Sequence, residues 1–386
     1  MAPPGVVIRA DAAPEPDLTE FPILQFGASR FLQAHVDLFV SEALPRGDAM
    51  GRIAVAGTTG SPESRRRIAA FAVGKPYPVL VKGLSDGAVV NERLQVSSVG
   101  AGLDAVTQWE ELERLFVAAR CAISNTADRG YETDPDDRPD AGPPRSFPAK
   151  LAKLLLARHR AGAKPITLFP CELTPGNGQV LRGVVLDMLD RWQAPADARR
   201  WVEEDCMWVN SLVDRIVSEP LEPLGAVAEP YALWAIEDQP GIELPCRHPS
   251  IVVAADLKPY ERLKLFILNL GHTYLAEIWS EEGGAPGLTV REAMDDTTML
   301  AKLDALYEDE VLPVFAAIGM GDEAQAYLKT VIERLSNPFL DHRLSEILIN
   351  HEAKKQRRFG GLIELANANS ARVNLPRLKT ALADGR

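Results

Sequence analysis

Short apolar runs alternate with longer amphipathic stretches over the first two-thirds of the chain. FPILQF (21–26) and RIAVAG (52–57) are such runs, and each comes before a segment with the period of a helix. KPITLF (164–169) repeats the apolar run further along the chain. Because parallel strands need crossover connections, which are usually helices, this alternation predicts a parallel sheet with helices packed on it.

The pattern changes near residue 255. From ERLKLFILNLGHTYLAEIW (261–279) onward, apolar residues recur at helical spacing, and no segment alternates convincingly as a strand does. We therefore predict an α/β domain of the Rossmann-like, dinucleotide-binding type at 21–255, followed by an all-α helical substrate domain at 256–386. Residues 1–20 contain no long apolar stretch and are predicted to be a flexible lead-in.

Composition and charge argue against several classes of protein. The chain has 386 residues, with 54 acidic against 42 basic side chains and a formal net charge of −12, which disfavours nonspecific binding to nucleic acid or to anionic membranes. The sequence contains no run of about 18 apolar residues, so no membrane span is predicted. The four cysteines are far apart and lack metal-ligand spacing, which indicates free thiols in a reducing cytoplasm and no metal site. The expected partner is a small molecule, and the expected state is a monomer or small homo-oligomer.

The segment QFGASRFLQAH (25–35) directly follows the first apolar run. A dinucleotide-binding fold places its glycine turn there, so that the pyrophosphate meets free N–H groups at the start of a helix. Gly27 occupies the first glycine position, whereas Ser29 and Leu32 occupy the second and third. A lone glycine turn is a weak signal, and a tight turn without a ligand fits the pattern equally well.

The segment after the second apolar run bears on the choice of cofactor. A fold that selects NAD usually offers an acid to the ribose 2′-hydroxyl here, while an arginine can accept the 2′-phosphate of NADP. Thr58 comes first, Glu63 is the earliest acid, and Arg65, Arg66 and Arg67 follow. NAD is the expected cofactor and NADP is not excluded, although a solvated basic face of a helix also explains the arginines.

KLFILNLGH (264–272) places three polar residues in an otherwise apolar run. At about 100° per residue, Lys264, Asn269 and His272 fall within one sector of a helix. A desolvated lysine can become a general base, an amide can donate to a developing oxyanion, and a histidine can fix an orientation. A polar stripe facing water is the alternative, but the position beside the domain boundary, where ligand clefts are favoured, argues for a site.

Two further segments of the first domain carry polar residues in an apolar frame. FPCELTPGNG (169–178) follows a predicted strand and holds Glu172 and Asn177. It lies at the sheet edge where α/β folds bind ligands, although an ordinary loop fits as well. Asp214 and Arg215 lie together in VNSLVDRIV, where a structural ion pair is the simpler interpretation.

Several segments together resemble one known family. The spacing Lys264-x4-Asn269-x2-His272 is similar to the signature of the polyol-specific long-chain dehydrogenases, the mannitol dehydrogenase family. Further similar segments follow in family order between residues 21 and 341: ILQFGASRFLQAH, SNTADRGY, SFPAKL, PCELTPGNG, NSLVDRI and RLSNPFLD. Within the family, FPAKL, PCEL and LVDRIV are most similar to the tagaturonate (altronate) and fructuronate reductases.

The resemblance implies an NAD(P)-dependent oxidoreductase that interconverts a secondary alcohol and a ketone of a polyol, sugar acid or ketose without a metal. Lys264 would be the acid/base, Asn269 and Asn177 would polarise the substrate oxygen, and His272 would orient the substrate or the lysine. The cofactor-binding residues would be Gly27, Ala28, Ser29 and Phe31 at the pyrophosphate, Thr58, and Asn125, Thr126 and Asp128 beside the nicotinamide. The residues expected near the substrate are Glu172, Asp214, Arg215 and Arg334.

Two other functions stay open at this point. An NAD-containing epimerase of the same fold would keep its cofactor bound through dialysis, without net turnover. A non-catalytic homologue would bind only a nucleotide or a sugar. If the substrate is acidic, it needs a cation in the cleft, and Arg343 and the KKQRR run (354–358) are candidates beside Arg215 and Arg334 that the sequence does not rank.

Overall fold

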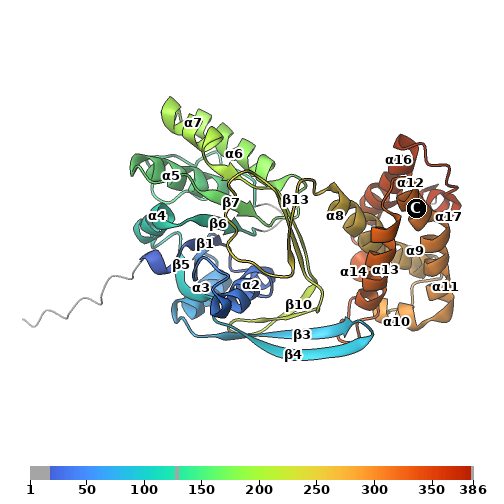
Figure 1. The fold of residues 1–386 in the computed structure, drawn as a ribbon. Helices are drawn as coiled ribbons and strands as arrows, with labels where there is room; N and C mark the ends of the chain where they lie inside the picture. The colour runs from blue at the N-terminus through green and yellow to red at the C-terminus, as the bar shows by residue number, and fades with distance from the viewer. Residues whose placement is uncertain (1–17, 127–129, 384–386) are drawn as a thin grey trace, which may run out of the picture.

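The computed structural model describes residues 18–126 and 130–383 (Figure 1). Its centre is a six-stranded parallel sheet with the order β5-β2-β1-β6-β7-β8. In that order the strands are Val99–Asp104, Ile53–Gly57, Ile23–Phe26, Cys121–Ser124, Thr167–Pro170 and Met207–Trp208. The strand order reverses between β1 and β6, as in a dinucleotide-binding Rossmann fold. The prediction of such a fold for the first domain is confirmed.

Helices cover both faces of this sheet. Leu24 and Phe26 of β1 belong to one apolar cluster and Ile23 to another, because successive strand residues point to opposite faces. The strands β1, β2 and β6 are consequently buried along their whole length, which explains why they are almost entirely apolar, with Gln25 and Ser124 as the polar exceptions. The helices of this domain are α1 (Arg30–Gln33), α2 (Val36–Ala43), α3 (Pro62–Ala72), α4 (Trp109–Ala118), α5 (Phe147–Arg160), α6 (Asn177–Arg191) and α7 (Ala196–Glu204).

Two smaller sheets accompany the central one. The first has the order β10-β11-β3-β4, with bounds Val217–Pro220, Ala226–Ala228, Tyr77–Ser85 and Ala88–Val96, and the second, β13-β12-β9, is formed by Ile251–Ala254, Leu233–Glu237 and Ser211–Asp214. The antiparallel hairpin β3–β4 departs from the simple parallel alternation that the sequence pattern predicts. Its two-residue turn consists of Asp86 and Gly87, both with positive φ (51° and 76°). An Asp-Gly pair between two strands favours a hairpin of this kind.

The second domain is helical. After β13, its segments in chain order are α8 (Lys258–Leu263), η3 (Lys264–Asn269), α9 (Leu270–Glu281), α10 (Val290–Asp295), α11 (Thr297–Leu306), η4 (Tyr307–Val311), α12 (Leu312–Ala317), α13 (Gly321–Leu335), α14 (Leu344–Ile347), α15 (His351–Lys355), η5 (Gln356–Gly360), α16 (Gly361–Ala368) and α17 (Pro376–Ala383). The segments η3, η4 and η5 are π-helical. The predicted fold class, α/β followed by all-α, is confirmed, while the predicted boundary at 255/256 stays a prediction. Among the described residues, no helix is long and apolar enough to cross a membrane.

The hairpin β3–β4 reaches from the first domain to the second (Figure 1). At its tip, the backbone N–H groups of Asp86 and Gly87 donate to the carboxylate of Glu333 on α13, at 3.2 and 2.6 Å. Further along, the side chain of Asn337 donates to the carbonyl of Lys82 at 3.1 Å. These contacts connect the two domains at the edge of the space between them.

Candidate active site

A cavity of about 550 Å³ lies at the carboxyl ends of β1, β2 and β6. In register, Phe26 at the end of β1 pairs with Ala56 of β2 and with Ser124 of β6, so the loops that follow the three strands lie together. This is the point where the strand order reverses, which is where open α/β sheets bind their ligands. Predicted cofactor residues that line this cavity are Gly27, Ala28, Ser29, Thr58, Asn125 and Thr126. Asp128 lies outside the described residues.

The turn after β1 depends on a glycine. Gly27 has a φ of +109°, and a Cβ atom on it would lie 2.6 Å from the carbonyl oxygen of Asn125. A side chain would therefore separate the loops after β1 and β6. The hydroxyl of Ser29 accepts from the N–H of Leu32 at 3.2 Å and donates to Oδ1 of Asn125 at 2.9 Å. The serine in the second glycine position thus caps α1 and ties the same two loops together.

The helix predicted after this turn is interrupted. The sequence pattern predicts one helical segment, whereas α1 has four residues and α2 begins at Val36. His35 lies between them with φ −125° and ψ −94°, and its Nε2 lies 3.0 Å from the carbonyl oxygen of Leu233 on β12. A helix of one turn has only a weak dipole, so anion binding at this turn depends mainly on individual N–H groups.

The arginines after β2 are mostly engaged. Arg65 donates to Asp104 at 3.0 Å, and Arg67 donates to Glu63 at 2.5 Å. Glu63, Arg67 and Thr58 line the cavity, whereas Arg65 does not appear in its lining within the described residues. Two of the three arginines that left NADP open therefore already have carboxylate partners.

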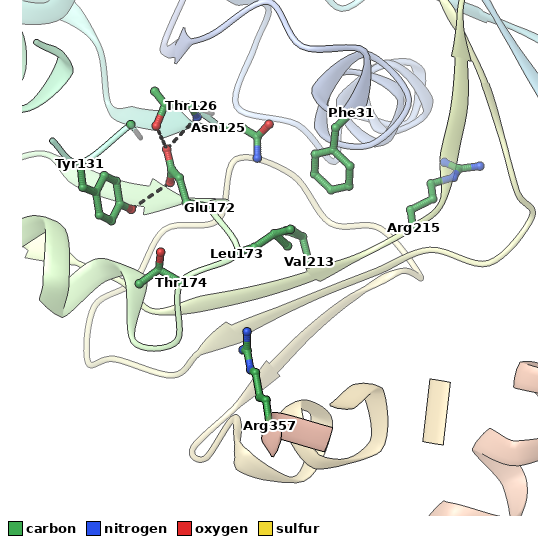
Figure 2. Close-up of a pocket in the computed structure, with 11 residues that line it drawn as sticks. Phe31, Asn125, Thr126, Tyr131, Glu172, Leu173, Thr174, Val213, Arg215 and Arg357 are labelled. Carbon is green, nitrogen blue, oxygen red and sulfur yellow. Dashed lines mark hydrogen bonds between the residues drawn. The ribbon is translucent and has the colours of Figure 1, made fainter. Parts of the chain in front are cut away.

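A second cavity, of about 560 Å³, adjoins the first and shares Asn125, Thr126 and Gly130 with it. Its remaining lining residues are Phe31, Tyr131, Glu172, Leu173, Thr174, Val213, Arg215 and Arg357 (Figure 2). Phe31 lies here, and not among the residues lining the cavity at the glycine turn. The two cavities have the relation expected of a cofactor cleft and a substrate pocket that meet at one place.

Glu172 organises the loop after β6. Its Oε1 accepts from the N–H and the hydroxyl of Thr126, both at 2.9 Å, and its Oε2 accepts from Ser124 at 3.1 Å and Tyr131 at 2.9 Å (Figure 2). Four donors thus use both carboxylate oxygens of a buried residue. The predicted substrate residue Glu172 fixes the wall of the pocket in this geometry.

Asn177 has no free hydrogen-bonding group. Its Nδ2 donates to the carbonyls of Pro170, Glu172 and Ser211 at 2.9, 3.0 and 2.9 Å, and its Oδ1 accepts from the N–H of Ser211 at 2.9 Å. The side chain is fully buried. The prediction that Asn177 donates to the substrate oxygen does not fit this geometry, because both amide hydrogens already have backbone acceptors. The residue instead connects the ends of β7 and β9.

Lys264 lies at the boundary of the two domains, next to the second cavity. Its Nζ donates to the carbonyl oxygen of Val213 at 2.8 Å and lies 3.7 Å from Oδ1 of Asp214. Val213 itself lines the cavity. Burial lowers the pKa of Lys264, and the negative charge of Asp214 opposes part of that effect. A lysine in this setting is suited to acid/base chemistry, because its neutral form becomes accessible closer to physiological pH.

A buried network of charges lies behind Lys264. Arg334 of α13 binds both oxygens of Asp214, at 2.8 and 3.1 Å, and both oxygens of Glu229, at 2.8 and 2.9 Å. Tyr327 also donates to Asp214, at 3.0 Å. Burial alone would raise the pKa of Asp214, but the charges of Arg334 and Lys264 outweigh it and lower this pKa to about 2. Asp214 therefore stays ionised beside Lys264.

The same network changes the roles predicted for two arginines. Asp214 pairs with Arg334 and Lys264, and no ion pair joins it to Arg215 within the described residues. Arg215 donates three hydrogen bonds to the backbone carbonyls of Glu229 and Ala34. Arg334 is buried between two carboxylates and lines neither cavity. The guanidinium of Arg334 is fully engaged and does not fit the predicted contact with a substrate, whereas Arg215 lines the second cavity and its substrate role stays a prediction.

The π-helical turn η3 alters the predicted geometry around Asn269 and His272. The prediction that they share a sector with Lys264 assumes 100° per residue, the value of an α-helix, whereas i→i+5 hydrogen bonding winds residues 264–269 more loosely. Nδ1 of His272 lies 3.1 Å from the carbonyl oxygen of Leu268, and burial lowers the pKa of His272 to about 3. Within the described part of the chain, neither residue lines the second cavity. Their catalytic roles stay predictions.

Side chains from η4 and η5 bind the carbonyls of this π-helical turn. Tyr307 donates to the carbonyl of Ile267 at 2.9 Å, and Arg358 donates to the carbonyl of Asn269 at 3.1 Å. A Cβ atom on Gly271 would lie 1.9 Å from the Tyr307 hydroxyl oxygen, so only glycine admits this tyrosine. π-helical turns occur frequently at functional sites.

Comparison with protein families identifies the chain. The mannitol dehydrogenase Rossmann domain matches residues 22–245, and the mannitol dehydrogenase C-terminal domain matches residues 256–378. The chain belongs to the mannitol dehydrogenase family. The resemblance drawn from the sequence motifs is thereby confirmed, as is the assignment to a family of dehydrogenases.

Curated relatives and solved structures agree with this family. The altronate oxidoreductase of Bacillus subtilis (strain 168) is 33% identical over 368 residues, covering 88% of this chain and 74% of the relative. The altronate oxidoreductase of Klebsiella pneumoniae (strain 342) is 30% identical over 94% of this chain and 78% of its own. A D-sorbitol dehydrogenase in substrate-free form has a TM-score of 0.79 at 22% identity, covering 95% of this chain and 80% of that one. Pseudomonas fluorescens mannitol 2-dehydrogenase, solved with NAD and D-mannitol, has a TM-score of 0.73 at 20% identity, covering 95% and 79%. These structural likenesses support the fold.

Several residues of this family member's site escape sequence reasoning. Glu229 is a lone acid whose pairing with Arg334 spans 105 positions. Tyr131 lies in a long polar loop, and its place in the site comes from tertiary contacts: it lines the second cavity and donates to Glu172 and to the carbonyl of Asn177. The acceptor for Lys264 is a backbone carbonyl, that of Val213, which carries no sequence signal.

Proposed function

We propose that this protein is an NAD(P)-dependent dehydrogenase that interconverts a secondary alcohol and a ketone of a polyol or sugar acid, with Lys264 as the acid/base. The observation that carries the proposal is the position of the Lys264 amino group. It is desolvated, has a lowered pKa, and donates to the carbonyl of a residue that lines the second cavity. That cavity shares Asn125, Thr126 and Gly130 with the cavity at the carboxyl ends of the parallel strands.

The first cavity fits a dinucleotide. Gly27 lines this cavity, and a Cβ atom on it would lie 2.6 Å from the carbonyl oxygen of Asn125, so glycine keeps the loops after β1 and β6 together at the carboxyl ends of the strands, where such folds bind a pyrophosphate. Gly27, Ala28 and Ser29 would hold the pyrophosphate, and Asn125 and Thr126, shared by both cavities, would border the nicotinamide. When bound, this cofactor supplies the hydride acceptor or donor. The engaged arginines after β2 favour NAD over NADP.

The chain's own residues handle the proton. In the direction of oxidation, neutral Lys264 accepts the proton of the substrate hydroxyl at Nζ while the hydride leaves the same carbon for the cofactor, so that one alcohol yields one ketone. The ammonium that results is stabilised by ionised Asp214 at 3.7 Å and by the carbonyl of Val213. In the direction of reduction, Lys264 returns this proton to the substrate oxygen. Asn269 remains the proposed donor to that oxygen, and His272 the proposed orienting group.

The names of the relatives support the choice of substrate class. Two relatives at 33% and 30% identity are altronate oxidoreductases, which points to a six-carbon sugar acid. The structures of similar fold are named for sorbitol and mannitol, which are neutral polyols. We propose a sugar acid of the altronate type as the first substrate to test, with a neutral polyol as the second.

A substrate panel tests the proposal. Purified protein is assayed by NAD(P)H absorbance with hexonates, hexitols and hexitol phosphates, each with NAD and with NADP, and cofactor binding is measured separately by fluorescence titration. Turnover of at least one hexonate or hexitol with NAD is the expected result. Cofactor binding without turnover of any compound in the panel would contradict the proposal.

A further inference from the structure

The second cavity is lined by more positive than negative side chains. Its charged lining residues among those described are Glu172, Arg215 and Arg357, which is two positive charges against one negative. The chain as a whole carries a formal net charge of −12, so an excess of positive charge in the cavity runs against the composition. Arg357 is exposed, and such a local excess of positive charge around a concave site favours an anionic ligand.

Two of these three charges are already occupied. Glu172 accepts four hydrogen bonds from the loop after β6. Arg215 directs Nε and Nη2 to the carbonyl of Glu229, at 3.0 and 2.8 Å, and Nη1 to the carbonyl of Ala34 at 2.5 Å. These bonds hold both side chains in place, and three of the five N–H groups of Arg215 are used in them. Among the described residues, Arg357 is the charged residue of this lining that no such bond holds.

Arg357 differs from the other cations of the KKQRR run. Lys354 donates to the carbonyl of Ile347 at 2.7 Å, and Lys355 pairs with Glu277 at 3.0 Å. Arg358 donates to Asn269 and Thr273. By contrast, Arg357 makes no hydrogen bond or ion pair with any residue in 18–126 or 130–383. Figure 2 shows its side chain pointing from the helical domain toward Leu173 and Val213, across the cavity from Asn125.

The segment η5, which carries Arg357, is hydrogen-bonded to η3, which carries Lys264. Its neighbour Arg358 donates to the carbonyl of Asn269 at 3.1 Å and to the hydroxyl of Thr273, which ties η5 to η3 and α9. Lys264 belongs to the same η3 turn. A ligand held at one end by Arg357 would consequently have a defined position relative to Lys264. A cavity of about 560 Å³ has room for a six-carbon sugar acid, and its lining includes both Arg357 and Val213, whose carbonyl accepts from Lys264.

We propose that Arg357 binds the carboxylate of a sugar-acid substrate and thereby makes this enzyme prefer hexonates to neutral hexitols. The planar guanidinium matches a carboxylate with two parallel hydrogen bonds, which gives both affinity and orientation. This inference rests on the proposed dehydrogenase function and adds to it the residue that selects the substrate class.

The test compares acidic and neutral substrates in matched variants. Arg357→Gln removes the positive charge. Arg357→Lys keeps the charge but loses the planar guanidinium that makes two parallel hydrogen bonds, and Arg343→Gln is the control. Arg343 is an exposed arginine of the same domain that lines neither cavity. For each variant, kcat/KM is measured with NAD and with altronate, with the hexitol of the same configuration, and with the corresponding hexitol phosphate.

In Arg357→Gln, kcat/KM for the hexonate is expected to fall by about 30-fold or more, mainly through KM, while the value for the hexitol stays within about twofold. Arg357→Lys should lie between wild type and Arg357→Gln, and Arg343→Gln should equal wild type. Equal losses for hexonate and hexitol would overturn the inference. So would a wild-type preference for the hexitol, or a loss confined to the hexitol phosphate.

Direct binding separates this inference from the proposed function. Calorimetric titration of altronate into the protein saturated with NADH, which cannot accept a hydride from it, reports the carboxylate site without turnover. One outcome is that altronate binds to wild type but not to Arg357→Gln, while no compound in the panel is turned over. That outcome would contradict the proposed dehydrogenase function and support the carboxylate site at Arg357. Turnover of altronate with affinities that are equal in wild type and Arg357→Gln would keep the dehydrogenase and overturn the site.

Discussion

The amino group of Lys264 lies 3.7 Å from Oδ1 of Asp214, and the same carboxylate is bound at both oxygens by Arg334. Lys264 belongs to the helical domain and Asp214 to the first domain. The charges around the proposed acid/base are therefore in place only when the two domains are in contact. Burial lowers the pKa of Lys264, while Asp214 raises it, Arg334 lowers it and Glu229 raises it. The pH at which the lysine becomes a base follows from the balance of burial and these three charges.

Asp214→Asn should move the pH profile of oxidation toward lower pH. The substitution keeps the shape of the side chain but removes the negative charge that raises the pKa of Lys264, and it leaves the opposing charge of Arg334 in place. Because oxidation needs neutral Lys264, the acidic limb of log(kcat/KM) should shift to lower pH. The measurement is kcat/KM for oxidation between pH 5 and pH 10 in both proteins. A shift of the acidic limb to higher pH would show that another group controls it.

Lys264→Ala should lower turnover by orders of magnitude and leave cofactor binding intact. General acid–base catalysis contributes on the order of 10²–10⁴-fold, so kcat should fall by about that factor. Lys258→Ala is the matched control, since Lys258 is an exposed lysine at the start of α8, six positions away. Its kcat should equal that of wild type. Fluorescence titration with NADH checks that all three proteins bind the cofactor, and near wild-type activity in Lys264→Ala would refute the acid/base role.

Sequence periodicity predicts most of this fold but not its local exceptions. The buried parallel strands and the change to helix after β13 follow from apolar patterns, because burial on two faces gives continuous runs and burial on one face gives helical spacing. Asp86 and Gly87 are a recognisable turn signal for the β3–β4 hairpin. The alternation of strands and helices in the surrounding sequence nevertheless favours a parallel connection there. The π-helical turn at Lys264 has no such signal, because its altered winding depends on Tyr307 and Arg358, which come from distant segments.

Residue types locate this site better than they assign its roles. Gly27 lines the first cavity, as its local turn requirement favours, and the buried amino group of Lys264 donates to the carbonyl of Val213, which lines the second. Asn177 and Arg334 are polar residues in the right segments, yet both are fully engaged by the protein. Whether a buried polar group faces a ligand or a backbone carbonyl depends on tertiary contacts, which one sequence does not contain.

Glu172→Gln should weaken cofactor binding more than it slows catalysis. The substitution replaces one carboxylate oxygen by an NH₂ group, so that one of the paired donors from Thr126, Ser124 or Tyr131 loses its acceptor. The loop that borders both cavities then loses a charge-assisted contact, for which we expect KM for NAD to rise by about tenfold. Steady-state kinetics with varied NAD measure this. A tenfold fall in kcat with unchanged KM would instead indicate a direct role for Glu172 in the chemical step.

Gly271→Ala should destabilise the helical domain because of one specific contact. The new Cβ would lie 1.9 Å from the hydroxyl oxygen of Tyr307, which is itself bound to the carbonyl of Ile267. Overpacking of this kind costs about 1–3 kcal/mol, and the corresponding fall in melting temperature is on the order of 5 °C by calorimetry. Gly183→Ala, in the middle of α6 with no atom within 4 Å of the new Cβ, is the control and should be neutral or slightly stabilising.

The double variant Gly271→Ala/Tyr307→Phe identifies the cause of that destabilisation. Removing the hydroxyl leaves the ring carbon Cζ, 3.1 Å from the new Cβ, as the nearest atom of residue 307, so most of the clash disappears. Tyr307→Phe alone loses the hydrogen bond to Ile267 and should cost about 1 kcal/mol. The melting temperature of the double variant should therefore lie above that of Gly271→Ala. If the two single losses simply add, the hydroxyl contact is not the reason for glycine at this position, and the winding of the π-helical turn must require it in another way.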